Sequence, residues 1–189
     1  MKLSGFAFLF ALLSCISIGV NTNADIVVDA SEIGGDVVFS GSGEIDLSKF
    51  GQPAALARPG RVQADEFFLL GPAVNTNFDT YDVPFSGPST IGTGTGLFNA
   101  SANTGDAFGF DFLFGTLAVP DNYVSNTQLS GTTTFSNQTF QSMGLANGSY
   151  VWSLGTQSVR LNINPVPEPG AIPAIAVALG LVVRRHRKS

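Results

Sequence analysis

Cysteine, histidine and charge are scarce in this 189-residue chain. The single cysteine is Cys15 and the single histidine is His186, so both lie in the terminal segments and the central body contains neither. Nucleophilic hydrolysis most often needs a histidine base beside Ser or Cys, and zinc and copper sites need imidazole or thiolate ligands. The body also lacks a Gly-x-Ser-x-Gly element. These absences exclude a triad hydrolase and a zinc or copper site, and we expect a protein that is not an enzyme.

Basic side chains are also rare in the body, which contains only Lys49, Arg58, Arg61 and Arg160. All 14 acidic residues lie between Asp25 and Glu168, so removal of both ends leaves a balance of 4 − 14 = −10. Such an acidic surface repels phosphate backbones. The charge therefore excludes nucleic acid as a partner and is compatible with divalent cations, cationic partners or neutral sugars.

The residues that are abundant predict an all-β protein. Charged residues make up 12 % of the chain, whereas glycine (22) and phenylalanine (16) are common, a composition typical of short strands joined by turns. We expect strands at 26–28, 36–39 with 44–47 as a continuation past a Gly-Ser-Gly bulge, 67–70, 108–114, 135–140, 150–154 and 158–163. Gly34-Gly35 and Gly155-Thr156-Gln157 predict hairpins, and 52–59 and 75–95 are expected to be loops. The pattern favours a single antiparallel β-sandwich or jelly-roll-like domain over 25–164.

The N-terminal residues 1–24 have the pattern of a secretory signal peptide. Lys2 is followed by an apolar stretch from Phe6, and small residues precede the expected cleavage site between Ala24 and Asp25. Leu12-Leu13-Ser14-Cys15 also fits a lipobox, which would lipidate Cys15. The residues after Cys15 stay apolar, which favours a cysteine inside the signal peptide.

The C-terminal residues 165–189 combine three features. Val166-Pro167-Glu168-Pro169 is followed by 13 residues without charge, 171–183, and then by the basic segment 184–189 with Arg184, Arg185, Arg187 and Lys188. A membrane-spanning helix needs about 20 apolar residues, so on length alone the segment is a marginal span. We expect a short transmembrane helix that basic side chains extend by reaching the interface. The same basic cluster stays cytoplasmic by the positive-inside rule.

This order of prolines and glutamate, apolar helix and Arg-rich end resembles the PEP-CTERM sorting signal of exopolysaccharide-producing Gram-negative bacteria. The resemblance implies a precursor anchored in the inner membrane, recognition by an exosortase after signal peptidase has acted, and delivery to the cell surface or extracellular matrix. The apolar segment is shorter than usual for that family and contains Pro173. Segments 35–47 and 119–152 also resemble other PEP-CTERM proteins, and that resemblance implies no activity.

Carboxylates are the remaining candidates for chemistry in the body. Asp65-Glu66 and the pair Glu44 and Asp46 are the only close acidic pairs in strand-like context. Sequence neighbours point to opposite faces of a strand, and residues two apart lie about 7 Å from each other along one face. We therefore expect neither pair to act in glycoside hydrolysis.

A calcium site is the alternative that the Asx-rich segment suggests. The candidate oxygen ligands are Asn75, Asn77, Asp79 and Asp82. The first three are spaced two apart, as hard cations prefer, and Asp82 follows three positions later. The segment lacks the glycine and the distal glutamate of an EF-hand, and Asx-rich turns have the same pattern without a metal.

Aromatic residues suggest where a sugar could bind. The four phenylalanines at 108, 110, 112 and 114 share one face of a strand, where core packing is favoured over an exposed patch. The candidates for stacking on sugar rings are Tyr150 and Trp152 on one strand face, and Tyr81 and Tyr123 in expected loops. We expect an exported surface or matrix protein with a structural or adhesive role; the alternative is a module that binds exopolysaccharide, assisted by calcium.

Overall fold

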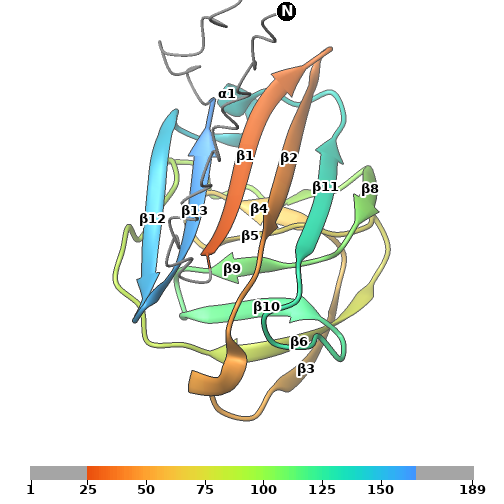
Figure 1. Ribbon diagram of the computed structural model, residues 1–189. Coiled ribbons are helices and arrows are strands. Elements are labelled where there is room, and N and C mark those ends of the chain that lie inside the picture. Colours follow the sequence, from red (N-terminus) through yellow and green to blue (C-terminus); the bar gives the residue numbers. More distant parts are fainter. Residues whose placement is uncertain (1–24, 165–189) are drawn as a thin grey trace, which may run out of the picture.

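A computed structural model describes residues 25–164, which form two β-sheets (Figure 1). The prediction of an all-β body made largely of antiparallel strands is confirmed. The predicted signal peptide 1–24 and sorting segment 165–189 lie outside the described residues.

Thirteen strands and two short helical turns make up the described body. Sheet A contains, in spatial order, β12 (Gly148–Leu154), β13 (Gln157–Ile163), β1 (Asp25–Ile33), β2 (Asp36–Gly43), β11 (Leu129–Phe135) and β8 (Ala102–Gly105). Sheet B contains β3 (Ala54–Arg58), β6 (Thr76–Asp82), β10 (Thr116–Pro120), β9 (Gly109–Asp111), β5 (Phe67–Leu69), β4 (Arg61–Gln63) and β7 (Phe98–Asn99). The helical turns are η1 (Leu47–Lys49) and α1 (Phe140–Met143).

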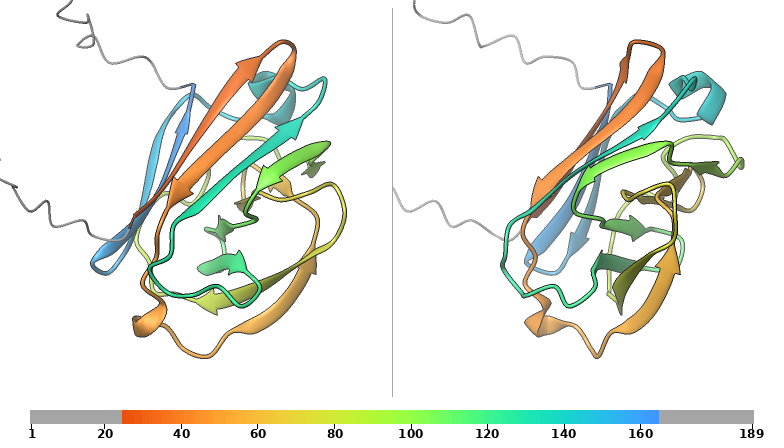
Figure 2. Two further views of the ribbon diagram at one scale, coloured as in Figure 1. Left: turned by 45° about the vertical axis from the view of Figure 1, so that its right-hand side comes forward. Right: turned by 90° about the vertical axis from the view of Figure 1, so that its right-hand side faces the viewer.

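The two sheets face each other across one apolar core. In Figure 1 the strands of sheet A run up the picture and those of sheet B run across it, and Figure 2 shows the sheets as two layers. Trp152 of sheet A is fully buried and stacks on Phe112, with ring centroids 5.2 Å apart, and it also contacts Phe68 and Phe110 of sheet B. This aromatic cluster joins the two layers at the centre of the core.

Both predicted hairpins are present. β1 and β2 pair in register across Gly34 and Gly35, whose φ values of 63° and 93° lie in the left-handed region that glycine tolerates. β12 and β13 pair with Trp152 opposite Val159. The alternation predicted for β13 is also confirmed, because its odd-numbered apolar residues 159, 161 and 163 are buried.

One pairing departs from the antiparallel expectation. β1 lies parallel to β13, with Asp25 opposite Ser158 and Ala30 opposite Ile163. Because the two strands run in the same direction, the start of β1 and the end of β13 lie at opposite ends of the pair. β1, the first described strand, and β13, the last, are neighbours in the middle of sheet A.

The expected loops 52–59 and 75–95 are wrong over part of their length, because they contain β3 and β6. These strands pair with each other at one edge of sheet B, with Ala54 opposite Thr80. Buried Thr80 donates its hydroxyl to the Ala54 carbonyl at 2.7 Å. The edge strand β3 is rich in alanine, and β6 contains Asn77, Asp79 and Asp82. These residue types are depleted in strands, so neither sequence gave a strand signal.

Two expected strand segments are also wrong. The expected continuation 44–47 is absent because β2 ends at Gly43 without a bulge in its pairing with β1, and the Asp46 side chain accepts from the Ser48 amide to cap η1. The expected strand 135–140 ends at its first residue. Phe135 is the last residue of β11. After it, Thr139 and Ser142 form a reciprocal capping box that begins α1.

The four-phenylalanine strand is shorter than expected. Phe108, Phe110 and Phe112 are buried in the core, but Phe114 is 72 % exposed. Strand β9 ends at Asp111, whose carboxylate accepts hydrogen bonds from the amides of Leu113 and Phe114. This turn breaks the period of two, so the fourth phenylalanine does not belong to the core.

Candidate functional site

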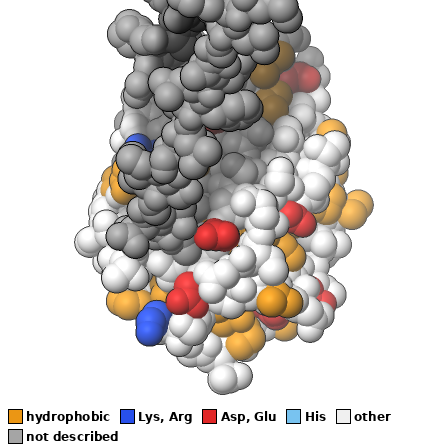
Figure 3. Space-filling model, viewed as in Figure 1, with side chains coloured by type: hydrophobic (Ala, Val, Ile, Leu, Met, Phe, Trp, Pro, Cys, Tyr) orange, Lys and Arg blue, Asp and Glu red, His pale blue; other side chains and the backbone are white. Residues whose placement is uncertain are grey.

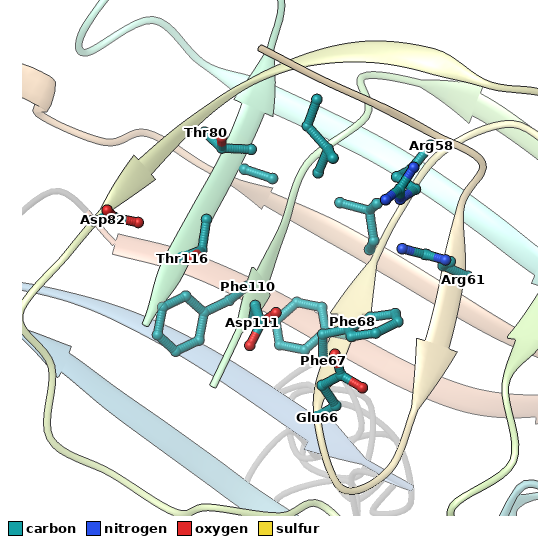
Figure 4. Close-up of a pocket in the computed structure, with 13 residues that line it drawn as sticks. Arg58, Arg61, Glu66, Phe67, Phe68, Thr80, Asp82, Phe110, Asp111 and Thr116 are labelled. Carbon is teal, nitrogen blue, oxygen red and sulfur yellow. The ribbon is translucent and has the colours of Figure 1, made fainter. Parts of the chain in front are cut away.

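A hollow of about 370 Å³ lies on the outer face of sheet B, the face turned away from sheet A. It spans β3, β6, β10, β9, β5 and β4 and is lined by Leu56, Arg58, Arg61, Glu66, Phe67, Phe68, Leu69, Thr80, Asp82, Phe110, Asp111, Thr116 and Ala118 (Figure 4). Two other hollows, of about 580 Å³ beside α1 and about 450 Å³ beside Asp106, are lined by no basic residue. We call the first one the sheet B hollow.

The register of sheet B explains how residues from six strands meet. One row across the sheet places Asp82 opposite Thr116, Thr116 opposite Asp111, and Asp111 opposite Phe67. The next row contains Thr80, Ala118, Gly109, Leu69 and Arg61. Side chains in both rows point to the outer face because their neighbours along each strand point into the core.

A small residue of β10, Ala118, lies at the floor of the hollow. Gly109 and Ala118 are neighbours across β9 and β10, so neither fills the space between larger side chains. A Cβ at Gly109 would lie 2.2 Å from the Phe68 carbonyl oxygen, so the close approach of β5 and β9 admits only glycine there. Phe67, Leu69, Phe78 and Ala118 form a small buried cluster on this face, separate from the main core.

Arg61 is held at one side of the hollow. Its guanidinium carbon lies 4.9 Å from the centre of the Phe67 ring, a cation–π contact. Its Nε is buried and has no hydrogen-bond partner. Burial, and then repulsion from Arg58, lowers the pKa of Arg61, while Glu66 and Asp111 oppose that shift. The guanidinium is thus placed by packing rather than by a close partner for Nε.

Two carboxyl groups lie next to the same aromatic ring. The Phe112 amide donates to the Glu66 carbonyl at 3.0 Å, which joins the turn before β5 to the end of β9. Asp111 uses Oδ1 to accept from the amides of Leu113, at 3.0 Å, and Phe114, at 2.8 Å. Burial raises the pKa of Asp111, and burial followed by the charge of Asp111 raises the pKa of Glu66.

The polar groups of the hollow are separated in space. Figure 4 shows Asp82, Thr80 and Thr116 on one side, Arg58 and Arg61 on the opposite side, and Asp111 with Glu66 beside Phe67. The hollow therefore offers hydrogen-bond donors from the arginines and acceptors from the carboxylates around an apolar floor. Such an arrangement is suited to binding a small polar molecule.

The four residues expected to bind calcium do not converge. Asp82 lines the sheet B hollow, whereas Asp79 is an odd-numbered position of β6 and points to the other face. Asp79 accepts instead from the Asn122 amide at 2.9 Å. Within 25–164 no group of three or more His, Cys, Asp or Glu residues is arranged to hold a metal ion. Asn75 and Asn77 are exposed at the start of β6, so this set is not one ligand sphere.

The expected sugar-stacking residues are also placed differently. Trp152 is fully buried and donates Nε1–H to the Pro88 carbonyl at 2.7 Å, and Tyr81 is a buried residue of β6 rather than a loop residue. Neither ring is available to a sugar. Tyr150 and Tyr123 are half-buried, and their hydroxyls donate to the carbonyls of Ala146 and Thr127. These four aromatics do not form one exposed platform.

One member of each acidic pair weighed in the sequence makes a local hydrogen bond. Asp65 accepts from the Gln63 side chain, and Asp46 caps η1. After burial, the charge of Asp111, which lies 45 positions further along the chain, raises the pKa of Glu66 more than the charge of Asp65 does. Sequence reasoning missed Arg58, Arg61, Glu66, Phe67 and Asp111 as a set. The one available signal was that two of the four basic residues of the body lie three positions apart.

The sorting residues are Ala24 at the expected signal-peptidase site, Val166, Pro167, Glu168 and Pro169 of the motif, and Arg184, Arg185, Arg187 and Lys188 of the basic segment. All of them lie outside the described residues. Asp25, on the other side of the expected cleavage site, is the first residue of β1, and its carboxylate accepts from the Ser158 hydroxyl. Among residues 25–164 there is no helix with both the length and the apolar character needed to cross a membrane.

Comparison with protein-family models, with curated proteins and with solved structures finds no match for this chain.

Proposed function

We propose that this chain is the precursor of an exported cell-surface or extracellular-matrix protein that an exosortase sorts. The observation that carries the proposal is the order of features in the sequence: a signal peptide at 1–24, a Pro-Glu-Pro element at 167–169, an apolar segment at 171–183 and a basic end. The signal peptide directs the chain to export, and the basic end keeps the last residues cytoplasmic. The body, a single β-sandwich of jelly-roll-like form, is then outside the inner membrane.

The boundaries of the folded body support this assignment. The last strand, β13, ends at Ile163, four positions before Pro167. The X-Pro units at 167 and 169 favour an extended backbone, which is the form that a protease cleft accepts. Cleavage near Pro167-Glu168-Pro169 therefore leaves every strand of the described body intact.

The role that we propose for the body is structural or adhesive rather than catalytic. Its sequence contains no histidine or cysteine to act as a base or thiol nucleophile. In the part of the surface that stays visible in Figure 3, acidic, basic and hydrophobic side chains are scattered and form no large patch of one kind. Such a surface is compatible with a structural role.

Replacement of Pro167, Glu168 and Pro169 by alanine tests the sorting proposal. We expect the variant to stay in the membrane fraction, while the wild-type body is released to the surface or the medium. Pro165→Ala, two positions before the motif, is the matched control and should sort as the wild type does. Equal release of the triple variant would contradict recognition of this motif.

A second candidate function is binding of exopolysaccharide, and the sheet B hollow is the observation that favours it. It combines an apolar floor with fixed donors and acceptors, whereas Trp152 and Tyr81 are buried. A binding assay with polysaccharide from the producing cells tests this function. We expect retention of the wild-type protein on that polymer, and no retention would remove this candidate.

A further inference from the structure

We propose that the sheet B hollow binds a neutral, hydroxyl-rich saccharide unit, and that Arg61 and Asp111 are the residues that orient it. This inference rests on the second candidate function, binding of a matrix polysaccharide. It goes further because it names the site, the chemical class of the sugar and the residues that select it.

The distribution of charge carries the first step. Residues 25–164 contain four basic and 13 acidic residues, so their balance is 4 − 13 = −9. Two of the four basic residues, Arg58 and Arg61, line this one hollow. The placement of scarce cations in a recess, beside carboxylates, indicates that donors are needed there.

The second step follows from the sign of the lining charges. Two arginines and three acidic residues, Glu66, Asp82 and Asp111, line the hollow, so their formal sum is 2 − 3 = −1. An anionic sugar would meet these carboxylates and the acidic body around them, and a cationic ligand would meet the arginines. Like-charge contacts of this kind select against both classes. A neutral ligand avoids both.

Hydroxyl chemistry matches the groups that remain. A sugar hydroxyl donates one hydrogen bond and accepts others, so it can donate to a carboxylate and accept from a guanidinium. The two amide bonds to Asp111 use Oδ1 only, which leaves Oδ2 as an acceptor for the ligand. Thr80 donates its hydroxyl hydrogen to Ala54, so its oxygen can act only as an acceptor towards the hollow.

The floor and the fixed arginine complete the site. Phe67, Leu69 and Ala118 are largely buried but line the hollow, unlike Tyr81, so they offer a narrow apolar floor to a sugar ring. Arg61 is packed over Phe67, so its planar donors are already oriented before a ligand binds, which lowers the entropy lost on binding. The volume of about 370 Å³ lies within the range of roughly 300–1,000 Å³ found for small-molecule sites.

The partial burial of Arg61 and Asp111 supports a role in binding rather than in stability. The buried Nε of Arg61 has no partner, and an unsatisfied buried donor lowers stability. Burial also raises the pKa of Asp111, which means that the folded protein disfavours its ionised form. Groups that reduce stability are expected where a ligand uses them.

The experiment compares neutral and acidic sugars of equal length on the purified mature protein. The probes are oligosaccharides of six neutral hexoses and of six uronic acids, and the readout is the dissociation constant from calorimetry. We expect the neutral probe to bind more tightly than the uronate probe. We also expect its affinity to change less than about two-fold between 50 and 500 mM salt, because no net charge is neutralised.

Two variants test the named residues. Asp111→Asn keeps an oxygen for the Leu113 and Phe114 amides but removes the charge, and Arg61→Gln removes the guanidinium. Each should weaken binding of the neutral probe about ten-fold, the effect expected for loss of a hydrogen bond to a charged group. The matched controls, Asp121→Asn and Arg160→Gln, change exposed residues outside the hollow and should bind as the wild type does.

Four outcomes would overturn the inference. They are tighter binding of the uronate probe, no binding of either probe, affinities in Asp111→Asn and Arg61→Gln equal to those of the controls, and loss of affinity that accompanies unfolding in a thermal melt of both variants. If the protein is sorted correctly and binds its own polysaccharide but fails these tests, the sheet B hollow is not the saccharide-binding site. The proposed function is then unaffected.

Discussion

Replacement of Trp152 by phenylalanine is the sharpest test of the core. Trp152 is fully buried, its ring stacks on Phe112 with an interplanar angle of 10°, and its Nε1–H donates to the Pro88 carbonyl at 2.7 Å. Phenylalanine keeps an aromatic ring at the contact between the sheets. It loses the donor and leaves a void beside Phe68 and Phe110.

The expected magnitude has two parts. Loss of the donor leaves the Pro88 carbonyl without its partner, which costs about 1–3 kcal/mol. The smaller ring leaves a cavity of about 40 Å³, which at about 24 cal/mol per Å³ costs about 1 kcal/mol. We therefore expect Trp152→Phe to lower the free energy of unfolding by about 2–4 kcal/mol. At about 3 °C per kcal/mol, the thermal midpoint should fall by about 6–12 °C.

Urea unfolding followed by far-UV circular dichroism measures this difference. Tryptophan fluorescence does not serve here, because the variant has lost the only tryptophan of the chain. Val151→Ala is the matched control, since Val151 is the preceding residue of β12 and points away from the core with 36 % exposure. The control should stay within about 0.5 kcal/mol of the wild type. A loss for Trp152→Phe as small as that of the control would refute the central place of the indole.

Asp111→Asn should raise the thermal midpoint at pH 7, because burial raises the pKa of Asp111 and the fold therefore disfavours the ionised form. The difference should shrink as the pH falls through that raised pKa towards the ordinary value of 3.8, since the wild type gains stability on protonation; a constant difference would contradict the cause. Gly109→Ala should cost more than about 2 kcal/mol in urea unfolding because its Cβ would overlap the Phe68 carbonyl, whereas Gly51→Ala, in open space, should change little. Thr139→Ala should cost about 1 kcal/mol through loss of the capping box, and an unchanged midpoint would show that α1 does not depend on it. EDTA should leave the midpoint of a thermal melt unmoved, and a fall of several degrees would restore the calcium site.

Local signals in the sequence were sufficient for part of the fold. The pair Gly34-Gly35 supplies the left-handed backbone that a two-residue hairpin turn needs, and the alternation after Gly155 identifies the buried face of β13. Both signals act between residues that are close in the chain. For that reason the two hairpins of sheet A and the buried face of β13 were predicted correctly.

Elements that depend on distant partners could not be predicted in the same way. β3 is alanine-rich and β6 contains Asn77, Asp79 and Asp82, so neither has a strong strand propensity. They exist because β3 pairs with β6, and β6 pairs with β10 in turn. Phe114 continues the alternation in the sequence, but Asp111 turns the chain before it. The competing local interaction decides the structure at each of these positions.

The candidate site was beyond local reasoning for a related reason. Its residues come from six strands, and Glu66 meets Asp111 only through the pairing of β5 with β9. The aromatic residues that were expected to bind a sugar were instead used by the core, as Trp152 shows. A pattern of neighbours in the sequence describes one strand, whereas a surface hollow is a property of the whole sheet.

The intact mass of the mature protein, purified from the surface or medium of the cells that make it, tests the central claim most directly. We predict a product that begins at Asp25 and ends near Pro167-Glu168-Pro169, without the apolar segment 171–183 and the basic residues 184–189. A mature protein that still carries residues 184–189 would contradict sorting by an exosortase and would leave a simple C-terminal membrane anchor.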